Sequence, residues 1–402
     1  MLEGDGMREF KQLTPYRKAL EMMLNDIEEI EETEELSLDE ALGRVLAEDI
    51  ESPIDLPPFD RSAVDGYAVR AEDTFQAREY SPVELEVIDE ITAGMESKKE
   101  VTNGKAVKLM TGNKMPKSAN AVIEQEKVKK EGNKIYVLRP VAPGQNVAFK
   151  GEDVKKGEVV LKKGQILRPQ DLGLLKGIGI KRITVKRKPK VGIIVTGDEL
   201  IEEPDEEGLN RGKILESNSV MLKGLVKQYS GEPVFYGVIP DDEELIGRAI
   251  EKAKRECDLV LITGGSAFGE KDYAHKFVKL LFHGCSNKPG RPIGYGERIF
   301  VMSGYPVAVF AQFHLYVKYA LAKLAGANYK PMKVKARLKE KVPSSLGRHE
   351  FVKVYYEDGK AYPIRKKGSG IISALVESNG YIEVPEDSEG YKEGEEVWVT
   401  LY

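Results

Sequence analysis

Four carboxylates follow short apolar segments in the central part of the sequence: Asp198, Glu199, Asp241 and Asp272. In an open parallel sheet, ligands bind beside the carboxyl ends of the strands, so side chains that follow strands converge there. Carboxylate oxygens are the donors that hard divalent cations prefer, and the four residues therefore predict a Mg²⁺ site. Asp241 taken alone is equally typical of a helix N-cap, because Glu244 follows it at capping-box spacing.

A glycine-rich loop follows the third of these apolar segments. Gly264, Gly265 and Gly269 lie between a predicted strand and a predicted helix. Backbone N–H groups in such a loop approach an anion closely, and the dipole of the following helix favours negative charge. The spacing matches neither the dinucleotide fingerprint nor the Walker A motif. A tight turn without a ligand is the other interpretation of the same residues.

Two cations flank a rigid dipeptide in the segment 287–292. Lys288 and Arg291 lie on either side of Pro289 and Gly290. Ammonium and guanidinium groups held in this way suit phosphate or another oxyanion. A solvated basic loop is the other interpretation, since such charges are most often found at the surface.

A second polar cluster lies at 57–70, where two carboxylates, a serine and two arginines occupy one Pro-bounded segment. Its pattern fits neither a helix nor a strand, and a turn with Asp60 and Arg61 paired in solvent is one interpretation. Polar turns also occur at 109–112 and 151–153. The four histidines show no metal-ligand spacing, so we expect packing or surface roles for them. Cys257 precedes an apolar strand and is expected to be inert.

Strands and helices alternate from about residue 190 onward and would position the central carboxylates. Predicted strands cover 191–196, 233–239, 258–263 and 298–302, and predicted helices cover 219–229, a segment from 241, 272–282 and 306–325. This alternation is typical of a parallel sheet covered on both faces. Right-handed crossovers make such a sheet doubly wound.

The flanking regions have other patterns. A helix is predicted over 14–30 with Thr14 as its cap, and a second from Ser37, whose capping box includes Glu40. The acidic residues 28–35 predict a solvated face or a hinge. Short β-prone segments follow between 52 and 146, and a short helix at 169–175. Strands after 327 predict a small barrel or sandwich.

The composition excludes several classes of protein. The chain has 402 residues, and its 66 acidic against 61 basic side chains give a net charge of −5. Non-specific nucleic-acid binding needs a basic surface and is not expected. No apolar segment approaches the about 18 residues of a membrane span, and the first ten residues lack the apolar core of a signal peptide. With only two cysteines, we expect a soluble cytoplasmic protein.

Taken in order, these motifs resemble those of the molybdopterin molybdenumtransferases, a family that includes bacterial MoeA and the C-terminal domain of gephyrin. The resemblance covers nearly the whole chain, and the segment 57–70 together with Thr-Gly-Asp-Glu-Leu at 196–200 is specific to it. It continues through 110–112, 144–146, 151–153, 217–219, 264–273, 288–292 and 368–370.

The resemblance implies a multidomain α/β plus β architecture with four domains. These are a discontinuous linking α+β domain at 7–51 and 147–186, an inserted β-rich domain at 52–146, a doubly wound parallel-sheet molybdopterin-binding domain at 187–327, and a C-terminal β-barrel at 328–402.

The resemblance also implies an enzyme of molybdenum cofactor biosynthesis, a molybdopterin molybdotransferase. Adenylylated molybdopterin and molybdate would react with assistance from Mg²⁺ or Zn²⁺, and AMP would be released. The enzyme would be a homodimer with its active site at the subunit cleft, in transient contact with the molybdopterin adenylyltransferase.

Residue roles carry over by resemblance in three groups. The catalytic candidates are Asp65, Thr111, Asp153, Glu199, Asp241 and Asp272. The cofactor-binding candidates are Gly264, Gly265, Gly269, Ser217, Asn218, Lys288, Arg291, Gly304 and Pro306. The metal-ligand candidates are Asp198, Glu199, Asp241 and Asp272.

The sequence departs from the family pattern at two places. The family usually ends its fourth strand with Pro-Gly-Asn-Pro, where this chain has Ser303-Gly304-Tyr305-Pro306. An arginine-rich segment of many members is Val-Ala-Phe-Lys at 147–150 here. Both differences leave molybdate or tungstate open as the metal source. A molybdopterin adenylyltransferase and a non-catalytic, gephyrin-like scaffold are the alternative functions.

Overall fold

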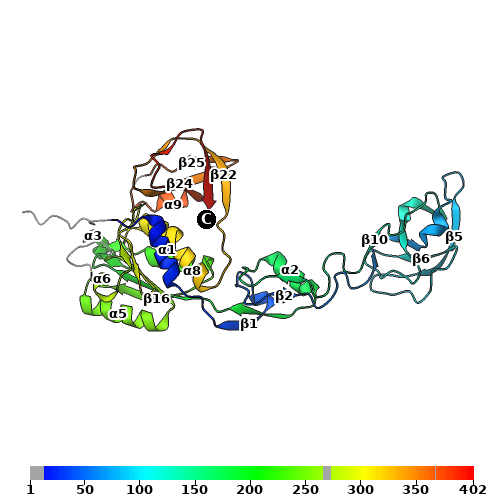
Figure 1. The fold of residues 1–402 in the computed structure, drawn as a ribbon, viewed down its shortest axis with the longest axis horizontal. Coiled ribbons are helices and arrows are strands. Elements are labelled where there is room, and N and C mark those ends of the chain that lie inside the picture. The colour runs from blue at the N-terminus through cyan, green and yellow to red at the C-terminus, as the bar shows by residue number, and fades with distance from the viewer. Residues whose placement is uncertain (1–12, 266–272, 367) are drawn as a thin grey trace, which may run out of the picture.

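The computed structural model describes residues 13–265, 273–366 and 368–402, and it forms an elongated molecule (Figure 1). An α/β region and a C-terminal barrel lie together at one end, and a β-rich region lies at the other. A smaller linking region lies between them, around helix α2 (Pro169–Gly177). This arrangement confirms the multidomain α/β plus β fold expected from the sequence.

The α/β region contains a six-stranded sheet in the order β16-β13-β17-β21-β20-β18. Its strands are β13 (Lys190–Thr196), β16 (Glu232–Ile239), β17 (Leu259–Thr263), β18 (Phe282–His283), β20 (Gly294–Gly296) and β21 (Ile299–Met302). The four predicted strands pair in parallel, whereas β20 and β18 add an antiparallel edge that the sequence pattern did not predict. Parallel strands buried on both faces read as continuous apolar segments, which is why they were recognisable.

Helices cover both faces of this sheet. They are α1 (Tyr16–Asp26), α4 (Asn218–Gln228), α5 (Glu243–Glu256), α6 (Ala274–Phe277), α7 (Pro306–Gln312) and α8 (Lys318–Leu324). Alternate residues of β13 point to opposite faces, as strand geometry requires. Ile193 packs in the core that holds α1, α4, α7 and α8, whereas Ile194 packs in the core that holds α5 and α6.

Several predicted element boundaries were wrong. The acidic segment contains strand β1 (Thr33–Ser37), which pairs with β12 (Arg182–Lys186). The capping box of Ser37 and Glu40 starts a short 3-10 helix, η1 (Leu38–Glu40), and Thr14 does not cap α1. The helix predicted over 306–325 contains a π-helical turn, η4 (Phe313–Val317), between α7 and α8. The first residue of the helix predicted over 272–282 lies outside the described residues, and α6 is much shorter.

The linking region has its own small core, which includes Leu46, Leu175 and Val185. Besides α2 and the β1–β12 pair, it contains the strands β2 (Ile50–Glu51) and β11 (Val159–Leu161). The β-rich region is a sheet in the order β7-β4-β6-β5-β9-β8. Its elements are β3 (Arg61–Ser62), β4 (Gly66–Val69), η2 (Ala71–Thr74), β5 (Val83–Glu90), β6 (Lys105–Leu109), β7 (Ala121–Glu124), η3 (Gln125–Lys127), β8 (Val128–Glu131), β9 (Lys134–Val137) and β10 (Val147–Ala148).

The C-terminal region closes into a barrel, because β24 pairs with both β25 and β26 while β22 and β28 complete the circuit. Its elements are β19 (Asn287–Lys288), β22 (Lys333–Leu338), β23 (Val342–Pro343), β24 (His349–Glu357), β25 (Lys360–Pro363), α9 (Ser373–Val376), β26 (Gly380–Val384), β27 (Gly390–Tyr391) and β28 (Glu396–Leu401). Closure removes the exposed strand edges that an open sheet would present.

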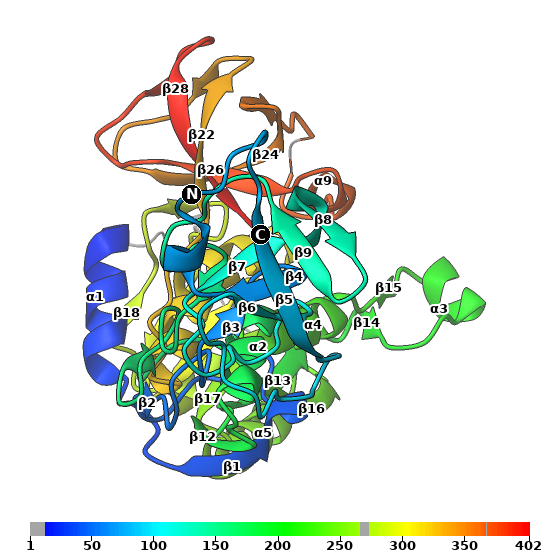
Figure 2. The ribbon, with the colours of Figure 1, turned by 90° about the vertical axis from the view of Figure 1, so that its right-hand side faces the viewer.

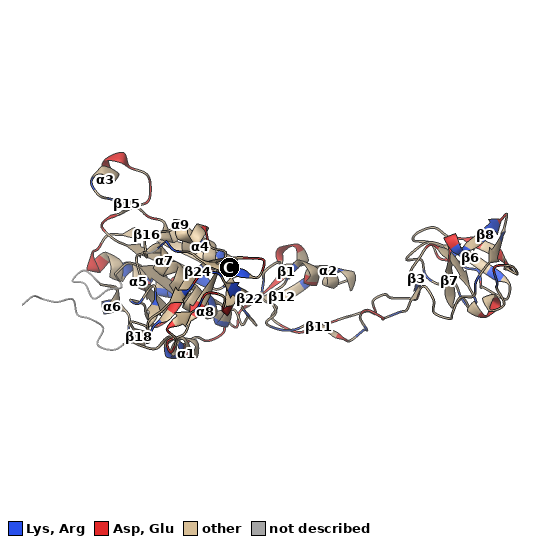
Figure 3. Ribbon diagram, turned by 90° about the horizontal axis from the view of Figure 1, so that it is seen from above, with Lys and Arg blue, Asp and Glu red and all other residues tan. Residues whose placement is uncertain are grey.

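An arm stands away from the α/β region in two perpendicular views (Figures 2 and 3). It consists of β14 (Leu200–Ile201), α3 (Glu206–Asn210) and β15 (Ile214–Leu215). Leu209, Ile214 and Leu215 on this arm are exposed apolar side chains. None of the described helices is both long enough and apolar enough to cross a membrane.

Candidate functional site

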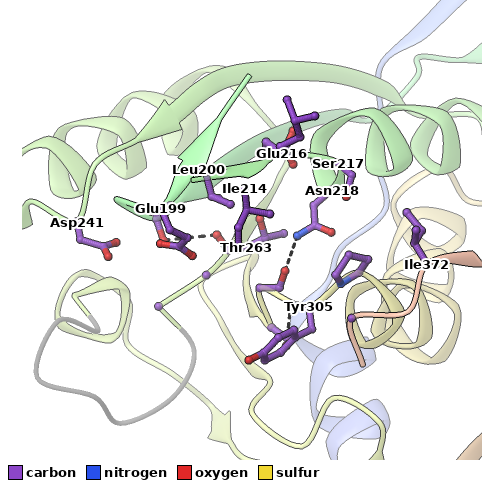
Figure 4. A pocket seen from close by; sticks show the side chains of 18 of the residues that line it. Glu199, Leu200, Ile214, Glu216, Ser217, Asn218, Asp241, Thr263, Tyr305 and Ile372 are labelled. Atoms are coloured by element: carbon purple, nitrogen blue, oxygen red, sulfur yellow. Dashed lines mark hydrogen bonds between the residues drawn. The ribbon is translucent and has the colours of Figure 1, made fainter. Parts of the chain in front are cut away.

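A cavity of about 690 Å³ opens at the carboxyl ends of β13, β17 and β21 (Figure 4). Its walls come from the ends of these three strands, the arm, the start of α4 and the loop before α9. The candidate site was expected at this edge of the sheet. Six of its predicted residues line the cavity: Ser217, Asn218, Gly264, Gly265, Gly304 and Pro306. The other end of the sheet carries none of these residues.

The glycine loop after β17 lies too close to β13 for a side chain. Gly264 has φ +93°, and a Cβ there would lie 2.4 Å from the backbone oxygen of Thr196. Only glycine fits both the left-handed backbone conformation and this contact. Gly265 also has a positive φ and lines the cavity. Gly269 and Asp272, predicted for the same loop, lie outside the described residues.

Two of the predicted acidic residues face the cavity. Glu199 and Asp241 both line it, and Figure 4 places their side chains beside one another at one end. Asp198 precedes them and holds the loop, because its Oδ1 accepts the backbone N–H of Asp241 at 3.0 Å. Among the described residues, no three His, Cys, Asp or Glu side chains form a metal-binding group.

The N-cap of α5 is Asp242 and not Asp241. Asp242 Oδ1 accepts the N–H of Leu245 at 2.9 Å, which is a side-chain cap of the usual kind. The capping role that the sequence suggested for Asp241 therefore belongs to its neighbour. This one-residue shift leaves the carboxylate of Asp241 on the cavity wall.

Two buried polar atoms on the cavity wall have no hydrogen-bond partner in the described structure. They are Asn218 Oδ1 and Thr263 Oγ1, in residues that are 6% and 1% exposed. Asn218 is held in place because its Nδ2 donates to Gly304 O at 2.7 Å (Figure 4). Buried polar groups are rarely left unpaired, so both atoms are suited to hydrogen bonds with a ligand. Thr263 was not among the predicted site residues. Its position as the last residue of strand β17 could have indicated it, because ligands bind at the carboxyl ends of parallel strands.

The loop after β21 is fixed from beneath by a buried glutamine. Gln312 Oε1 accepts the N–H of Ser303 at 3.0 Å, and its Nε2 donates to Gly290 O at 2.8 Å. One side chain thus joins the loop after β21 to the loop of Pro289 and Gly290. Tyr305, where the family pattern has asparagine, is 62% exposed and lines the cavity.

The predicted basic residues do not line the cavity. Lys288 Nζ pairs with Glu350 Oε1 at 2.7 Å, and Arg291 is exposed. Pro292, which follows them, does reach the wall. Among the described lining residues there is no lysine or arginine, so the positive charge of this loop lies beside the cavity rather than in it.

Asp65 and Thr111 lie in the β-rich region, at the opposite end of the molecule from the cavity (Figures 1 and 3). Asp65 Oδ1 accepts both the backbone N–H and the hydroxyl of Thr111, each at 2.7 Å. These bonds lower the pKa of Asp65, the backbone bond having the larger effect. Asp153 lies in an exposed turn, where its N–H donates to Leu56 O. One chain alone does not bring these residues to the cavity.

The cysteines and two of the histidines are buried, as expected for packing residues. Burial raises the pKa of the Cys285 thiol to about 12, and burial also raises the pKa of Cys257. A thiol with a raised pKa is a poor nucleophile. His314 is 1% exposed, and His349 Nε2 lies 2.9 Å from Glu383 Oε2.

Three family models match the chain in order. They are the MoeA N-terminal region (domain I and II) over 14–179, a "probable molybdopterin binding domain" over 192–323, and the MoeA C-terminal region (domain IV) over 335–402. The chain is 35% identical to the molybdopterin molybdenumtransferase of Staphylococcus epidermidis, with 91% of this chain and 90% of that protein covered. The chain belongs to the MoeA family.

Two further relatives span the MoeA fold. A molybdopterin molybdenumtransferase of Haemophilus influenzae is 34% identical, over 96% of this chain and 98% of that protein. The chain also matches the crystal structure of the molybdopterin biosynthesis moeA protein from Pyrococcus horikoshii OT3, with 65% sequence identity and a TM-score of 0.91. The match covers 97% of this chain and 100% of the Pyrococcus horikoshii chain. The MoeA architecture therefore extends over the α/β region, the β-rich region and the barrel together.

Proposed function

We propose that this chain is a molybdopterin molybdotransferase, which inserts molybdenum from molybdate into adenylylated molybdopterin and releases AMP in molybdenum cofactor biosynthesis. Membership of the MoeA family supports the reaction class. The observation that carries the assignment is the cavity at the carboxyl ends of β13, β17 and β21, with two unpartnered polar atoms on its wall. Both oxygen atoms lack a hydrogen-bond donor, which a ligand with N–H groups would supply.

The polar atoms would orient a heterocycle. Asn218 Oδ1 and Thr263 Oγ1 are acceptors that suit the ring N–H groups of a pterin, and the Asn218 amide is kept from rotating by Gly304 O. The backbone at Gly264 and Gly265 lies beside them without side chains, which allows a phosphate to approach closely. Both kinds of contact bind and orient the substrate.

Glu199 and Asp241 fit a magnesium ion. Mg²⁺ is typically bound through one or two carboxylates, several waters and substrate phosphates, and these two carboxylates line the same cavity. Zn²⁺ favours Cys and His donors, and none of the described lining residues is of either type. When bound, Mg²⁺ would polarise the phosphoanhydride that is cleaved as AMP leaves. Asp198 would keep the Asp241 loop in position.

The active protein would be a homodimer in which Asp65 and Thr111 of the partner subunit reach the cavity. The distance between the two regions within one chain supports this arrangement (Figure 1). The arm with Leu209, Ile214 and Leu215 offers apolar surface for the contact. The same proposal includes Asp153 near the shared site, a cytoplasmic location, and transient contact with a molybdopterin adenylyltransferase. The basic residues Lys288 and Arg291 would attract the anionic substrates toward the cavity from outside.

The test is release of AMP. Purified protein is mixed with adenylylated molybdopterin, Mg²⁺ and molybdate, and AMP is measured by chromatography. Glu199→Gln should reduce the rate by at least tenfold with the fold unchanged, whereas Glu357→Gln on the barrel should not. Parallel reactions with tungstate and with a Tyr305→Asn variant determine the oxyanion preference.

The alternatives make different predictions in the same assay. ATP-dependent adenylylation of molybdopterin without AMP release from the adenylylated form would identify an adenylyltransferase. Absence of both reactions together with absence of pterin binding would identify a scaffold. Either result, obtained with protein of confirmed fold, would refute the proposed function.

A further inference from the structure

A second cavity, of about 290 Å³, lies where three regions of the chain meet. The linking region contributes Gly43, Val45 and Ile166, and the barrel contributes Leu401 and Tyr402. The α/β region supplies Tyr229, Ser230 and Lys318, and the segment between α8 and β22 supplies Tyr329 and Lys330. It shares no lining residue with the first cavity.

The walls of this cavity are tied together by hydrogen bonds between distant segments. Ser230 Oγ donates to Gly43 O at 2.6 Å, which joins the end of α4 to the linking region. Tyr229 and Tyr329 meet edge to face, with ring centroids 5.7 Å apart. Two aromatic rings therefore form a fixed part of the wall.

Lys318 is the unusual residue of the cavity. It directly follows the π-helical turn η4 and is 1% exposed. Its Nζ donates to the hydroxyl of Tyr381 at 2.9 Å and lies 5.1 to 5.8 Å from the ring centroids of Tyr319, Tyr329 and Tyr381. These rings stabilise an ammonium group in part.

This ammonium has no counter-ion within contact distance. Within residues 13–265, 273–366 and 368–402, no carboxylate lies within 4.0 Å of Lys318 Nζ. The charge of Glu383, which lies further away, raises the pKa of Lys318 in part. Burying a charge without a paired opposite charge is costly, and lysines are almost never fully buried unless paired. An ammonium carries three N–H donors, and the hydrogen bond to Tyr381 uses one of them.

The charges around the cavity favour an anion. Lys330 is a second lysine on the wall, and none of the described lining residues is an aspartate or glutamate. Apart from Gln228 and Ser230, most of the other described lining residues are apolar or aromatic, among them Met332, Leu401 and Tyr402. A ligand for such a site combines one negative charge with a flat apolar body.

We propose that this cavity binds a small organic monocarboxylate of about the size of benzoate, with its carboxylate on Lys318 Nζ and its ring among Tyr229, Tyr329 and Tyr402. A volume of about 290 Å³ suits a small, single-ring ligand. Such a ligand would bridge the linking region, the α/β region and the barrel. The site is separate from the proposed catalytic cavity.

The pH dependence of binding follows from the charge of Lys318. Burial lowers the pKa of Lys318 to about 8, so the ammonium that pairs with a carboxylate is present below this pH and lost above it. The charged and titratable groups that face it are Glu383, Tyr381, Lys333, Tyr319, Tyr329 and His314. Benzoate should therefore bind about thirtyfold more weakly at pH 9.5 than at pH 7, in proportion to the ammonium fraction.

The experiment measures binding of sodium benzoate to the full chain by ligand-observed NMR and calorimetry. Benzamide has the same shape without the charge, benzylamine carries the opposite charge, and inorganic phosphate lacks the ring. We expect benzoate to bind at least tenfold more tightly than any of the three. If benzamide binds as tightly as benzoate, the proposed pairing of a carboxylate with Lys318 is wrong. If phosphate binds as tightly as benzoate, the proposed requirement for an aromatic ring is wrong.

Variants test the location of the site. Lys318→Met keeps the length of the side chain and removes its charge, and should abolish benzoate binding. Lys323→Met on the same helix changes an exposed lysine and should leave binding unchanged. Ala322→Leu fills the cavity with Lys318 intact and should also abolish binding, which keeps the test valid if Lys318→Met does not fold. Unchanged binding in Ala322→Leu would refute the proposal.

Discussion

Asp65 Oδ1 accepts two hydrogen bonds from one residue, the backbone N–H and the side-chain hydroxyl of Thr111, each at 2.7 Å. Both donors favour the ionised carboxylate, so the pKa of Asp65 is lower than usual. The two residues belong to different turns, one before β4 and one after β6. The pair therefore holds an exposed, ionised carboxylate in one orientation, and the lowered pKa comes from these two hydrogen bonds.

Removing the hydroxyl should raise the pKa of Asp65 without returning it to its usual value. Thr111→Val deletes the side-chain bond but keeps the backbone bond, which is the larger cause of the shift. Because the ionised form loses stabilisation, Asp65 will gain its proton at a higher pH than in the wild type. A carboxyl-detected NMR titration measures this directly. Thr111→Ser should restore the wild-type value, and an unchanged pKa in Thr111→Val would contradict the assigned hydrogen bond.

Thr263→Val should separate binding from stability. Thr263 Oγ1 is buried without a partner, so its replacement by a methyl group removes no hydrogen bond within the protein. Because an unpaired buried hydroxyl is costly, we expect the free energy of unfolding to stay the same or to rise by about 1 kcal/mol. Molybdopterin affinity should fall about fivefold, which corresponds to one neutral hydrogen bond of about 1 kcal/mol.

Calorimetry and thermal denaturation of the same Thr263→Val samples give both quantities. Thr184→Val, on β12 and away from the cavity, is the matched control and should change neither. Loss of stability without loss of affinity would mean that the hydroxyl has a structural partner and no ligand.

Gly66→Ala should disrupt the sheet of the β-rich region. A Cβ at Gly66 would lie 2.0 Å from the backbone oxygen of Ile123 on the paired strand β7. The strands must separate to accept it, at a cost of about 2 kcal/mol or more. Hydrogen exchange should be faster at β4 and β7, with the α/β region unaffected. Gly173→Ala in α2 meets no atom within 4 Å and should be neutral or stabilising.

Acid should weaken the ion pair between Asp258 and Arg187, which lies between β12 and β13. Burial raises the pKa of this carboxyl, but the guanidinium of Arg187, at 2.9 and 3.0 Å, and the N–H of Lys190 lower it by more. The folded-state pKa is thus below the unfolded value of about 4, and the ion pair stabilises the fold above that pH. The stabilisation is lost as the pH falls through the folded-state pKa.

Asp258→Asn should lower the free energy of unfolding by about 2 kcal/mol at pH 7, and by little at pH 2.5. Denaturant titrations at the two pH values make the comparison. Asp387→Asn, which removes a carboxylate on the barrel loop, is the control and should have no comparable effect. Equal destabilisation by Asp258→Asn at both pH values would exclude the ion pair as the cause.

The α/β region could be predicted because its strands are buried on both faces and its helices have apolar stripes. The alternation of strands and helices also predicted at which edge of the sheet a ligand would bind. By contrast, β1 was missed because an acidic segment reads as solvated, and only its pairing with the distant β12 makes it a strand. Pairing between residues far apart in the chain leaves no local pattern.

Within the candidate site, residue types were easier to predict than contacts. The sequence indicated Asn218 and Gly264, but not that Asn218 Oδ1 would be left unpaired. Lys288 has the chemistry of a phosphate ligand, yet its partner is Glu350, which lies 62 residues later in the chain. Two adjacent aspartates compete for the N-cap of α5, and only the path of the loop decides which one faces the cavity.

The long separation between Asp65 and the sheet edge has a consequence for inheritance. In the proposed homodimer each site is assembled from two copies, so each of these residues needs to be intact in only one of them. A protein with Asp65→Asn and a protein with Glu199→Gln would each be inactive, yet a mixed pair would contain one complete site. Two defective alleles of this gene would then complement each other in one cell, and a single defective allele would impair half of the sites in every mixed pair.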